Sequence, residues 1–245
     1  MSSFSQGLYS ASPDQYSVEL NSAEFTELQN YLVKTQGATH GMKYKVCNKD
    51  LETTRTDSVS SQVEEIFRIE RNGEDDRFSK SPYAKLKGDR RLLWHGSRTT
   101  NFGGILSQGL RIAPPEAPVN GYMFGKGVYL ADISSKSANY CQHHQSGGIG
   151  LLLLCEAELG KPMLELLHSD QNAAENAKKK GCYATWGQGV TGPVAWKNAG
   201  CVSKALKGVM MVSSAKLISR DVVTDWVLSL ILNALLRIPA SMELR

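Results

Sequence analysis

The sequence predicts an α+β fold, because it contains apolar patterns of two kinds. Apolar residues recur at helical spacing in the short segments 22–34 and 102–110. They fall mostly on alternate positions in residues 63–70, and they form a nearly continuous run over residues 149–157. The alternating segment is typical of a half-buried strand, and the continuous run is typical of a strand covered on both faces.

The first third of the chain is expected to hold a tail, one helix and two strands. Residues 1–21 show little apolar periodicity and are predicted to be a disordered tail. A helix is predicted over residues 22–34, because Ser22 is a good N-cap and the apolar residues behind it share one face. Strands are predicted at residues 44–46 and 63–70, separated by a polar loop.

The middle of the chain alternates between short elements and loops. Three prolines between residues 113 and 118 remove backbone donors and restrict φ, so this segment is predicted to be a loop. The other elements expected in chain order are a helical turn at 79–86, a strand at 91–96, a helix at 102–110, a strand at 127–131, a helix from 134 to about 140, a strand at 149–157 and a loop rich in Lys and Gly at 173–192.

The C-terminal residues 212–245 are predicted to be an atypical tail, mainly helical, because apolar residues recur at helical spacing between Val223 and Leu235. The apolar run from Trp226 to Leu236 is too short to span a bilayer, and polar residues interrupt it. No membrane association is therefore expected.

Composition indicates an ordinary globular protein. Hydrophobic residues make up 41% of the 245 positions, enough for a core of normal size. The 28 basic and 24 acidic residues are mixed along the chain, with only short clusters such as Lys178-Lys179-Lys180. A dedicated nucleic-acid footprint is normally denser, so DNA binding is not expected from this chain.

The cysteines and the first residues indicate a soluble intracellular protein. The five cysteines never form a C-x-x-C pair, which disfavours a zinc site and a disulfide framework and favours a reducing compartment. The first residues are polar and rich in serine, unlike a secretory signal.

Common cofactor motifs are not supported. Gly121, Gly125 and Gly127 do not fit G-x-G-x-x-G, and they precede a strand, so a Rossmann fold is disfavoured. There is no phosphate-binding loop pattern, and His143-His144 lacks a second set of ligands at helical spacing. No metal is expected.

Three segments carry a resemblance to a known family. Leu92-Leu93-Trp94-His95-Gly96-Ser97-Arg98, residues 121–132 and residues 135–140 closely resemble the signature of the poly(ADP-ribose) polymerases. The resemblance extends more loosely from about Leu28 to Met211. It implies an ADP-ribosyltransferase fold, with mixed and antiparallel twisted sheets around an NAD cleft, and a catalytic domain over residues 22–211.

The resemblance assigns roles around NAD, which is the substrate. A glycine at a strand end also suits a carboxamide clamp on physical grounds, because its backbone donor and acceptor can approach a ligand closely. The roles implied are a ribose contact for His95, a carboxamide clamp for the Gly96 main chain and the Ser137 hydroxyl, a stacking surface for Tyr140, the opposite wall for Tyr129, a place beside the reacting ribose for Lys136, the adenosine side for Ser97, Asn101 and Arg111, and the pocket border for Tyr122.

For each of these residues taken alone, a structural role is favoured: a tyrosine in a strand is more often a core or sheet-face residue than a ligand wall. Their joint order and spacing favours the NAD site. The transition state is expected to resemble an oxocarbenium ion, by analogy with other glycosidic cleavage.

The sequence departs from the family at its late strands. The family's catalytic glutamate lies in a pattern like Asn-Glu-Tyr-Ile, and this chain has no such segment. Glu243 is the only glutamate in the tail, and Glu156 and Glu158 belong to a different predicted strand. The fold is therefore expected to be incomplete at its C-terminus, and polymer elongation is expected to be weak or absent.

The resemblance implies an enzyme that transfers ADP-ribose from NAD to protein acceptors and releases nicotinamide. By the same resemblance it is expected to be a nuclear protein connected with DNA repair, and a monomer. Two alternatives stay open: a catalytically impaired NAD-binding module, and a truncated fragment with no cellular role. Nicotinamide release separates the enzyme from the module, and cooperative unfolding separates both from the fragment.

Overall fold

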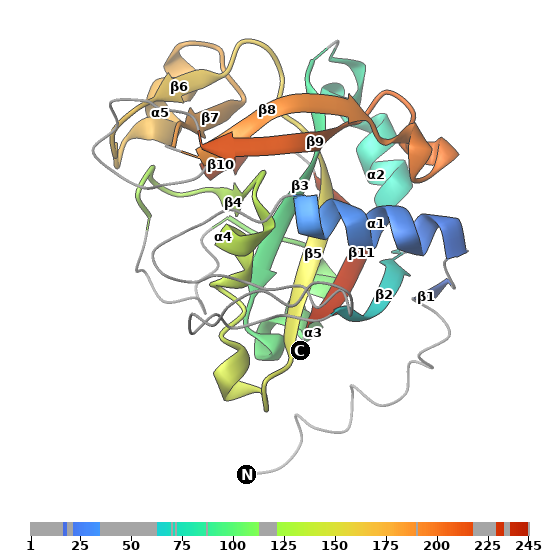
Figure 1. The fold of residues 1–245 in the computed structure, drawn as a ribbon. Coiled ribbons are helices and arrows are strands. Elements are labelled where there is room, and N and C mark those ends of the chain that lie inside the picture. The colour runs from blue at the N-terminus through green and yellow to red at the C-terminus, as the bar shows by residue number, and fades with distance from the viewer. Residues whose placement is uncertain are drawn as a thin grey trace.

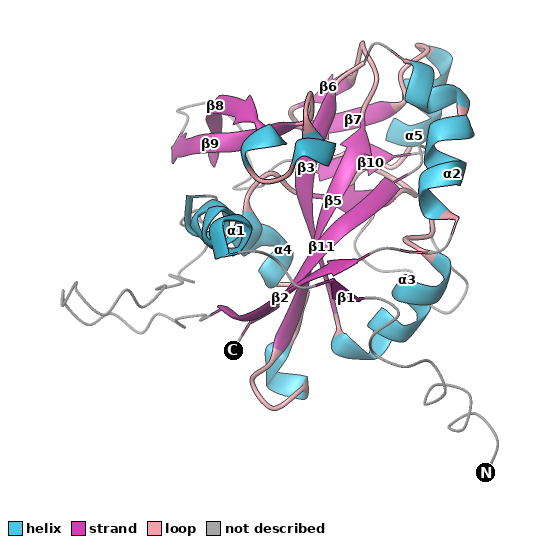
Figure 2. Cartoon of the chain, turned by 90° about the vertical axis from the view of Figure 1, so that its right-hand side faces the viewer, coloured by secondary structure: helices cyan, strands magenta, loops and turns pink. Residues whose placement is uncertain are grey.

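The fold consists of two β-sheets with short helices around them (Figures 1 and 2). The computed structural model describes residues 17–18, 22–34, 63–69, 71, 73–86, 88–112, 122–189, 191–217, 229–232 and 236–244. Figure 2 shows α1 on one side of the larger sheet and α2 and α3 on the other. The helices are α1 (Ser22–Lys34), α2 (Glu74–Lys80), α3 (Phe102–Gln108), α4 (Ser134–Ala138) and α5 (Ala173–Lys179).

Among the described residues, the larger sheet has seven strands and the smaller has four. In spatial order the larger sheet contains β1 (Ser17–Val18), β2 (Val63–Ile69), β11 (Leu236–Leu244), β5 (Gly150–Glu158), β3 (Arg90–Ser97), β9 (Met210–Leu217) and β8 (Thr191–Asn198). The smaller contains β4 (Val128–Leu130), β10 (Ser229–Leu232), β7 (Ala184–Gly187) and β6 (Leu164–Leu166). The β3–β9 and β6–β7 pairs are parallel and the other pairs are antiparallel, which confirms the α+β class with mixed sheets.

The two sheets meet where β3 runs beside the end of β4. The Trp94 amide donates to the Ala131 carbonyl at 2.7 Å, and the Ala131 amide donates back to the Trp94 carbonyl at 2.8 Å. This bridge fixes the end of β4, and the chain that follows it, against the middle of β3.

The core lies on both faces of β3 and β5, as the continuous apolar run predicted. Leu92, Trp94 and Leu152 belong to the cluster under α1, and Leu93 and Leu153 belong to the cluster on the opposite face, all with 0% exposure. The alternation follows from the strand geometry, in which successive side chains point to opposite faces. Buried apolar side chains therefore cover both faces of the sheet at β3, and this packing fixes the position of the strand.

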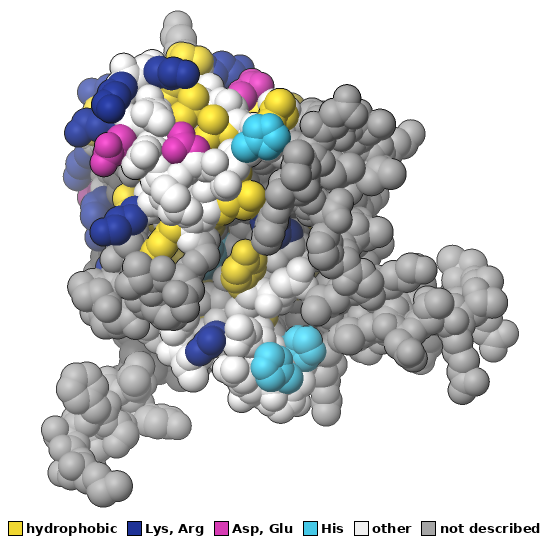
Figure 3. All heavy atoms as spheres, turned by 90° about the vertical axis from the view of Figure 1, so that its left-hand side faces the viewer, with side chains coloured by type: hydrophobic (Ala, Val, Ile, Leu, Met, Phe, Trp, Pro, Cys, Tyr) yellow, Lys and Arg dark blue, Asp and Glu magenta, His cyan; other side chains and the backbone are white. Residues whose placement is uncertain are grey.

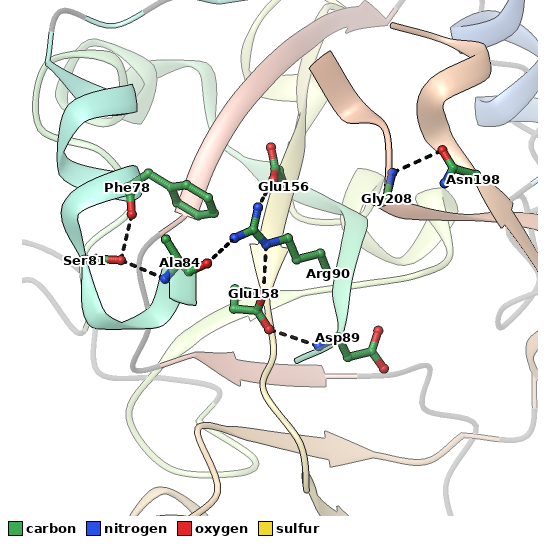
Figure 4. A network of polar contacts seen from close by, with 9 residues as sticks. All are labelled: Phe78, Ser81, Ala84, Asp89, Arg90, Glu156, Glu158, Asn198 and Gly208. Carbon is green, nitrogen blue, oxygen red and sulfur yellow. Dashed lines mark hydrogen bonds and ion pairs between the residues drawn. The ribbon is translucent and has the colours of Figure 1, made fainter. Parts of the chain in front are cut away.

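A buried ion cluster ties the start of β3 to the end of β5 (Figure 4). Arg90 donates from Nε to the Glu158 carboxylate at 2.9 Å and lies 3.6 Å from the Glu156 carboxylate. It also donates to the Ala84 carbonyl at 2.9 Å, and its guanidinium lies over the Phe78 ring. Glu156 and Glu158 thus face Arg90, and their contacts with it connect β5 to β3.

The predicted helical tail is wrong for its described residues. β10 pairs with β4 and β7 in the smaller sheet, and β11 pairs with β5 and β2 in the larger. An apolar run of this length fits a helix or a buried strand equally well. A helix satisfies its backbone hydrogen bonds internally, whereas a strand needs partners on neighbouring strands. Here those partners come from strands that are distant in the sequence, so the segment forms strands.

Two other local predictions also need correction. The disordered tail over residues 1–21 is wrong at β1, which pairs with β2. The loop predicted at residues 173–192 contains α5 and β7, because Ala173 and Ala177 pack one face of a short helix into the core. The strand predicted at 44–46 and the proline-rich segment 113–118 lie outside the described residues.

Charged residues are mixed on the surface, as composition predicted. On the face shown in Figure 3, Lys and Arg side chains gather toward the top, near α5 and β6, with acidic side chains among them. Lys178, Lys179 and Lys180 are exposed there beside the exposed Glu175. Within the described part of the chain, no helix has the length and apolar character needed to cross a membrane.

Candidate active site

His95, near the end of β3, is joined to β4 through a backbone hydrogen bond. Its Nδ1 lies 2.9 Å from the Tyr129 carbonyl oxygen, and since a carbonyl can only accept, Nδ1 carries the proton. Burial lowers the pKa of His95, while the contact with Tyr129 opposes this change. The ring is therefore neutral near pH 7, and Nε2 is left as a hydrogen-bond acceptor suited to a hydroxyl group.

Gly96 follows His95 at a point where no other residue fits. A Cβ atom at this position would lie 1.7 Å from the Ser137 carbonyl oxygen and 3.2 Å from the Cys141 Sγ atom. The backbone of α4 therefore lies directly against β3. The close approach brings the backbone of Ser137 against Gly96, and these are the two residues predicted to hold the carboxamide.

Ser137 holds its hydroxyl against β3. Its Oγ donates to the Trp94 carbonyl at 2.9 Å, and the side chain is 4% exposed. Because a hydroxyl has one proton, Oγ in this orientation can only accept from a ligand. A carboxamide N–H group is a suitable donor, whereas a bond to the carboxamide oxygen requires the hydroxyl to turn away from Trp94.

The three tyrosines predicted for the NAD site, Tyr122, Tyr129 and Tyr140, lie near one another. The Tyr129 hydroxyl donates to the Gly125 carbonyl at 2.6 Å and accepts from the Phe124 amide at 3.1 Å, which fixes the ring. Tyr122 and Tyr129 have ring centroids 6.2 Å apart. Burial raises the pKa of Tyr129, and the proximity of Tyr122 and Tyr140 adds to this effect.

Tyr140 presents its ring to solvent, with 55% of its surface exposed. An exposed aromatic ring next to a buried polar clamp is a suitable surface for a flat heterocycle. The Tyr140 amide donates to the Ser137 carbonyl at 3.0 Å, so the residue predicted to stack on the ring lies next to a residue predicted to hold the carboxamide.

The residues predicted for the adenosine side lie at the end of β3 and in the segments that follow it. Asn101 donates from Nδ2 to the Ser97 Oγ atom at 2.9 Å, so these two side chains are together. Arg111 is exposed and follows α3 in the chain. Residues 113–121, which precede Tyr122, lie outside the described residues.

Lys136 and Asp132 are two ionisable residues, partly buried and buried, and the sequence predicts a role for only one of them. The resemblance implies a role for Lys136, whereas it assigns none to Asp132. Burial raises the pKa of Asp132 to about 7, and Lys136 and Arg91 oppose this. Burial lowers the pKa of Lys136 to about 8, and Asp132 opposes this.

Metal ligands do not cluster in the described residues. No group of three or more His, Cys, Asp or Glu side chains there is arranged to hold a metal ion.

Comparison with known proteins identifies the family. The model of the poly(ADP-ribose) polymerase catalytic domain matches residues 22–219. The chain belongs to the poly(ADP-ribose) polymerase family. The match includes every residue predicted for the NAD site, and it extends beyond the boundary at residue 211 that the resemblance implied.

Several known polymerases are similar to this chain over most of its length. Poly(ADP-ribose) polymerase 2-A of Oryza sativa subsp. japonica is 49% identical over 176 residues, which cover 72% of this chain and 23% of that protein. Poly(ADP-ribose) polymerase 1 of Gallus gallus is 49% identical over 177 residues, covering 72% of this chain and 15% of that protein. The chain therefore spans less than a quarter of the length of either relative.

The late strand beside Tyr129 differs from the pattern of the poly(ADP-ribose) polymerases. β10 runs antiparallel to β4, and Ile231 lies opposite Tyr129. Its sequence, Ser-Leu-Ile-Leu, contains no carboxylate. Glu243 lies in β11 opposite Leu151, in the other sheet. Among the described strands next to β4, none therefore supplies the glutamate of the family pattern.

Proposed function

We propose that this chain is an NAD ADP-ribosyltransferase, which transfers ADP-ribose from NAD to protein acceptors and releases nicotinamide. The observation that supports this most directly is the close approach of α4 to Gly96, 1.7 Å from a hypothetical Cβ to the Ser137 carbonyl, beside the exposed ring of Tyr140. It forms a carboxamide clamp and a stacking surface in a chain of the poly(ADP-ribose) polymerase family.

The reaction follows from the contacts that this site offers. Gly96 and Ser137 would hold the nicotinamide carboxamide, and Tyr140 would hold the ring, so that the bond from the ring nitrogen to the ribose is fixed in position. The neutral His95 would accept a hydrogen bond from a ribose hydroxyl through Nε2. Holding both sides of this bond favours its cleavage through an oxocarbenium-like transition state.

The composition of β10 affects the transfer step that comes after cleavage. A carboxylate beside the reacting ribose would hold a hydroxyl and activate an incoming acceptor. Since Ser229–Leu232 contains none, we propose that transfer stops at a single ADP-ribose unit or at water, and that long polymer is not made. A nuclear location and a monomeric state belong to the same proposal.

The test is nicotinamide release by the purified chain. Thermal unfolding is measured with and without benzamide, which mimics the nicotinamide carboxamide, and NAD is then added to the same sample. Stabilisation by benzamide together with nicotinamide release supports the proposal. Stabilisation without release leaves a module that binds but does not react, and it contradicts the enzyme.

His95→Ala is expected to lower release at least tenfold, whereas His144→Ala, which replaces an exposed histidine between α4 and β5, is expected to leave it unchanged. The size of the product from labelled NAD is read on the same samples. Long polymer made by the purified chain would contradict the restriction to single units.

A further inference from the structure

α3 leads from the end of β3 to the segment that carries Arg111. The helix has only seven residues, and two of them, Gly103 and Gly104, are glycines, which favour a helix less than most other residues do. An isolated helix of this length is unstable in water. The position of α3 therefore depends on contacts with the rest of the molecule.

The start of α3 is anchored to β3 and to the core. Asn101 donates from Nδ2 to the Ser97 Oγ atom at 2.9 Å. Phe102, the first residue of the helix, is 5% exposed and belongs to the same buried cluster as Leu93 of β3. These contacts fix only the end of α3 that is nearest to Gly96 in the chain.

The other end of α3 is held by Arg71, which lies after the end of β2. Its Nε donates to the Leu106 carbonyl at 2.8 Å, and its Nη2 donates to the Ser107 carbonyl at 3.5 Å. Carbonyls in the last turn have no partners within the helix, and a cation suits them because this end carries a partial negative charge. The guanidinium also lies against Gly109, where a Cβ atom would be 2.9 Å from Nη1.

Arg71 is itself held by a buried carboxylate, that of Glu74 at the start of α2. Its Nη1 donates to the Glu74 Oε1 atom at 2.8 Å, and the two side chains are 8% and 7% exposed. The Glu74 amide donates to the Arg71 carbonyl at 3.0 Å, so a tight turn brings the carboxylate back to the guanidinium. One guanidinium thus connects the start of α2 to the end of α3, and Figure 2 shows both helices on the same side of the larger sheet.

These contacts set the direction in which the chain leaves α3. Gly109 ends the helix with a positive φ of 83°, and its amide donates to the Ile105 carbonyl at 2.7 Å. Arg111, which is exposed, follows two residues later. Because Arg71 contacts both the last turn of the helix and Gly109 itself, its removal frees the turn from which Arg111 projects.

We propose that Arg71 is a positioning residue for the adenosine side of the NAD site, and that it acts by fixing the end of α3 and with it Arg111. The inference rests on the proposed function, in which NAD is the substrate, and on the placement of Arg111 on the adenosine side. Arg71 itself touches no substrate, since each of its three side-chain nitrogens donates to a carbonyl or to the Glu74 carboxylate.

The two halves of the site are therefore expected to respond differently to the loss of Arg71. Arg71→Met keeps an apolar stem and removes the donors. It is expected to weaken the binding of ADP-ribose about tenfold and to raise KM for NAD about tenfold, because binding contacts on the adenosine side are lost in the substrate and the transition state alike. Benzamide binding and kcat are expected to stay within about twofold. Calorimetry with each ligand and initial rates of nicotinamide release on the full chain measure these values.

Two further variants separate positioning from a general effect on the fold. Arg77→Met is the matched control, because Arg77 is exposed in α2 and its loss removes the same charge; ADP-ribose binding is expected to stay unchanged. Arg71→Lys keeps the charge without the planar fork of donors, and it is expected to restore binding only in part. An arginine with a structural role alone would lower the unfolding temperature and weaken both ligands equally or neither.

A folded Arg71→Met variant with unchanged ADP-ribose binding overturns the inference, and so does equal weakening of ADP-ribose and benzamide. If Arg71→Met does not fold, Arg71→Lys decides: ADP-ribose binding is expected to be about threefold weaker with benzamide binding unchanged. An unchanged dissociation constant for ADP-ribose in that variant counts against the inference.

The two proposals can fail separately. If the unmodified chain binds ADP-ribose but releases no nicotinamide, the proposed function fails, and ADP-ribose binding alone decides on Arg71. If the unmodified chain binds benzamide but not ADP-ribose, the inference about Arg71 fails, and the carboxamide clamp remains.

Discussion

Gly96 shows how one residue type sets the geometry of the candidate active site. The backbone of α4 occupies the place where a side chain would begin, so β3 and α4 lie closer together than two ordinary residues would allow. The same contact keeps Ser137 buried against Trp94. The chemistry of the clamp therefore depends on the absence of a methyl group.

Gly96→Ala is expected to abolish stabilisation by benzamide, because the added Cβ would lie 1.7 Å from the Ser137 carbonyl oxygen and must push α4 away. Gly104→Ala is the control, since a Cβ at that position of α3 meets nothing within 4 Å. It is expected to raise the free energy of unfolding by about 0.5–1 kcal/mol and to leave binding intact. The measurement is thermal unfolding with and without benzamide; unchanged binding by Gly96→Ala would show that the clamp does not lie here.

The ion cluster of Figure 4 shows how single side chains join elements. Glu158, at the end of β5, accepts hydrogen bonds from the Asp89 and Gly160 amides and from Arg90, and it is 1% exposed. Arg90 in turn reaches the carbonyl of Ala84, in the 3₁₀ turn after α2. One carboxylate thus links β3, β5 and the segment after α2.

Glu158→Ala is expected to lower the free energy of unfolding by about 3 kcal/mol, because it leaves buried amides without an acceptor and weakens the pairing of Arg90. Asp76→Ala breaks an exposed pair with Lys80, whose side chain is 76% exposed, and is expected to cost less than about 0.5 kcal/mol. Urea unfolding monitored by circular dichroism checks both values. Equal losses in the two variants would argue against a linking role for Glu158.

At the scale of the whole molecule, the two C-terminal strands complete the two sheets, one strand in each. β10 lies between β4 and β7, and β11 lies between β2 and β5. Each strand pairs on both sides, so neither sheet is continuous without it. Residues 229–244 are thus required by the fold as a whole.

Ile231→Pro is expected to remove cooperative unfolding, because proline lacks the backbone donor that a central strand needs. The change falls opposite Tyr129 in β4 and Thr185 in β7, so both neighbours are affected. Ile231→Val, which keeps a β-branched residue, is the control and is expected to unfold in one transition. Tryptophan fluorescence and circular dichroism are followed on heating; a single, unshifted transition in the proline variant would contradict the role given to β10.

The order of the local elements could be predicted from the sequence, because it depends on periodicity and on residues close in the chain. The run at 149–157 predicts β5, and the helical spacing after Ser22 predicts α1. The motif around His95 and Gly96 indicates the family, which the comparisons confirm. These features are local, because each depends on side chains that are close together in the sequence.

Only the tertiary structure decided how distant segments pair. The tail from Ser229 to Leu244 is ambiguous between helix and strand until β4, β5 and β7 offer it open backbone groups. The ionisation of Asp132 is equally hidden in the sequence, since it depends on burial and on the charges of Lys136 in α4 and Arg91 in β3. Backbone pairing and burial are properties of the folded chain, and a linear pattern does not contain them.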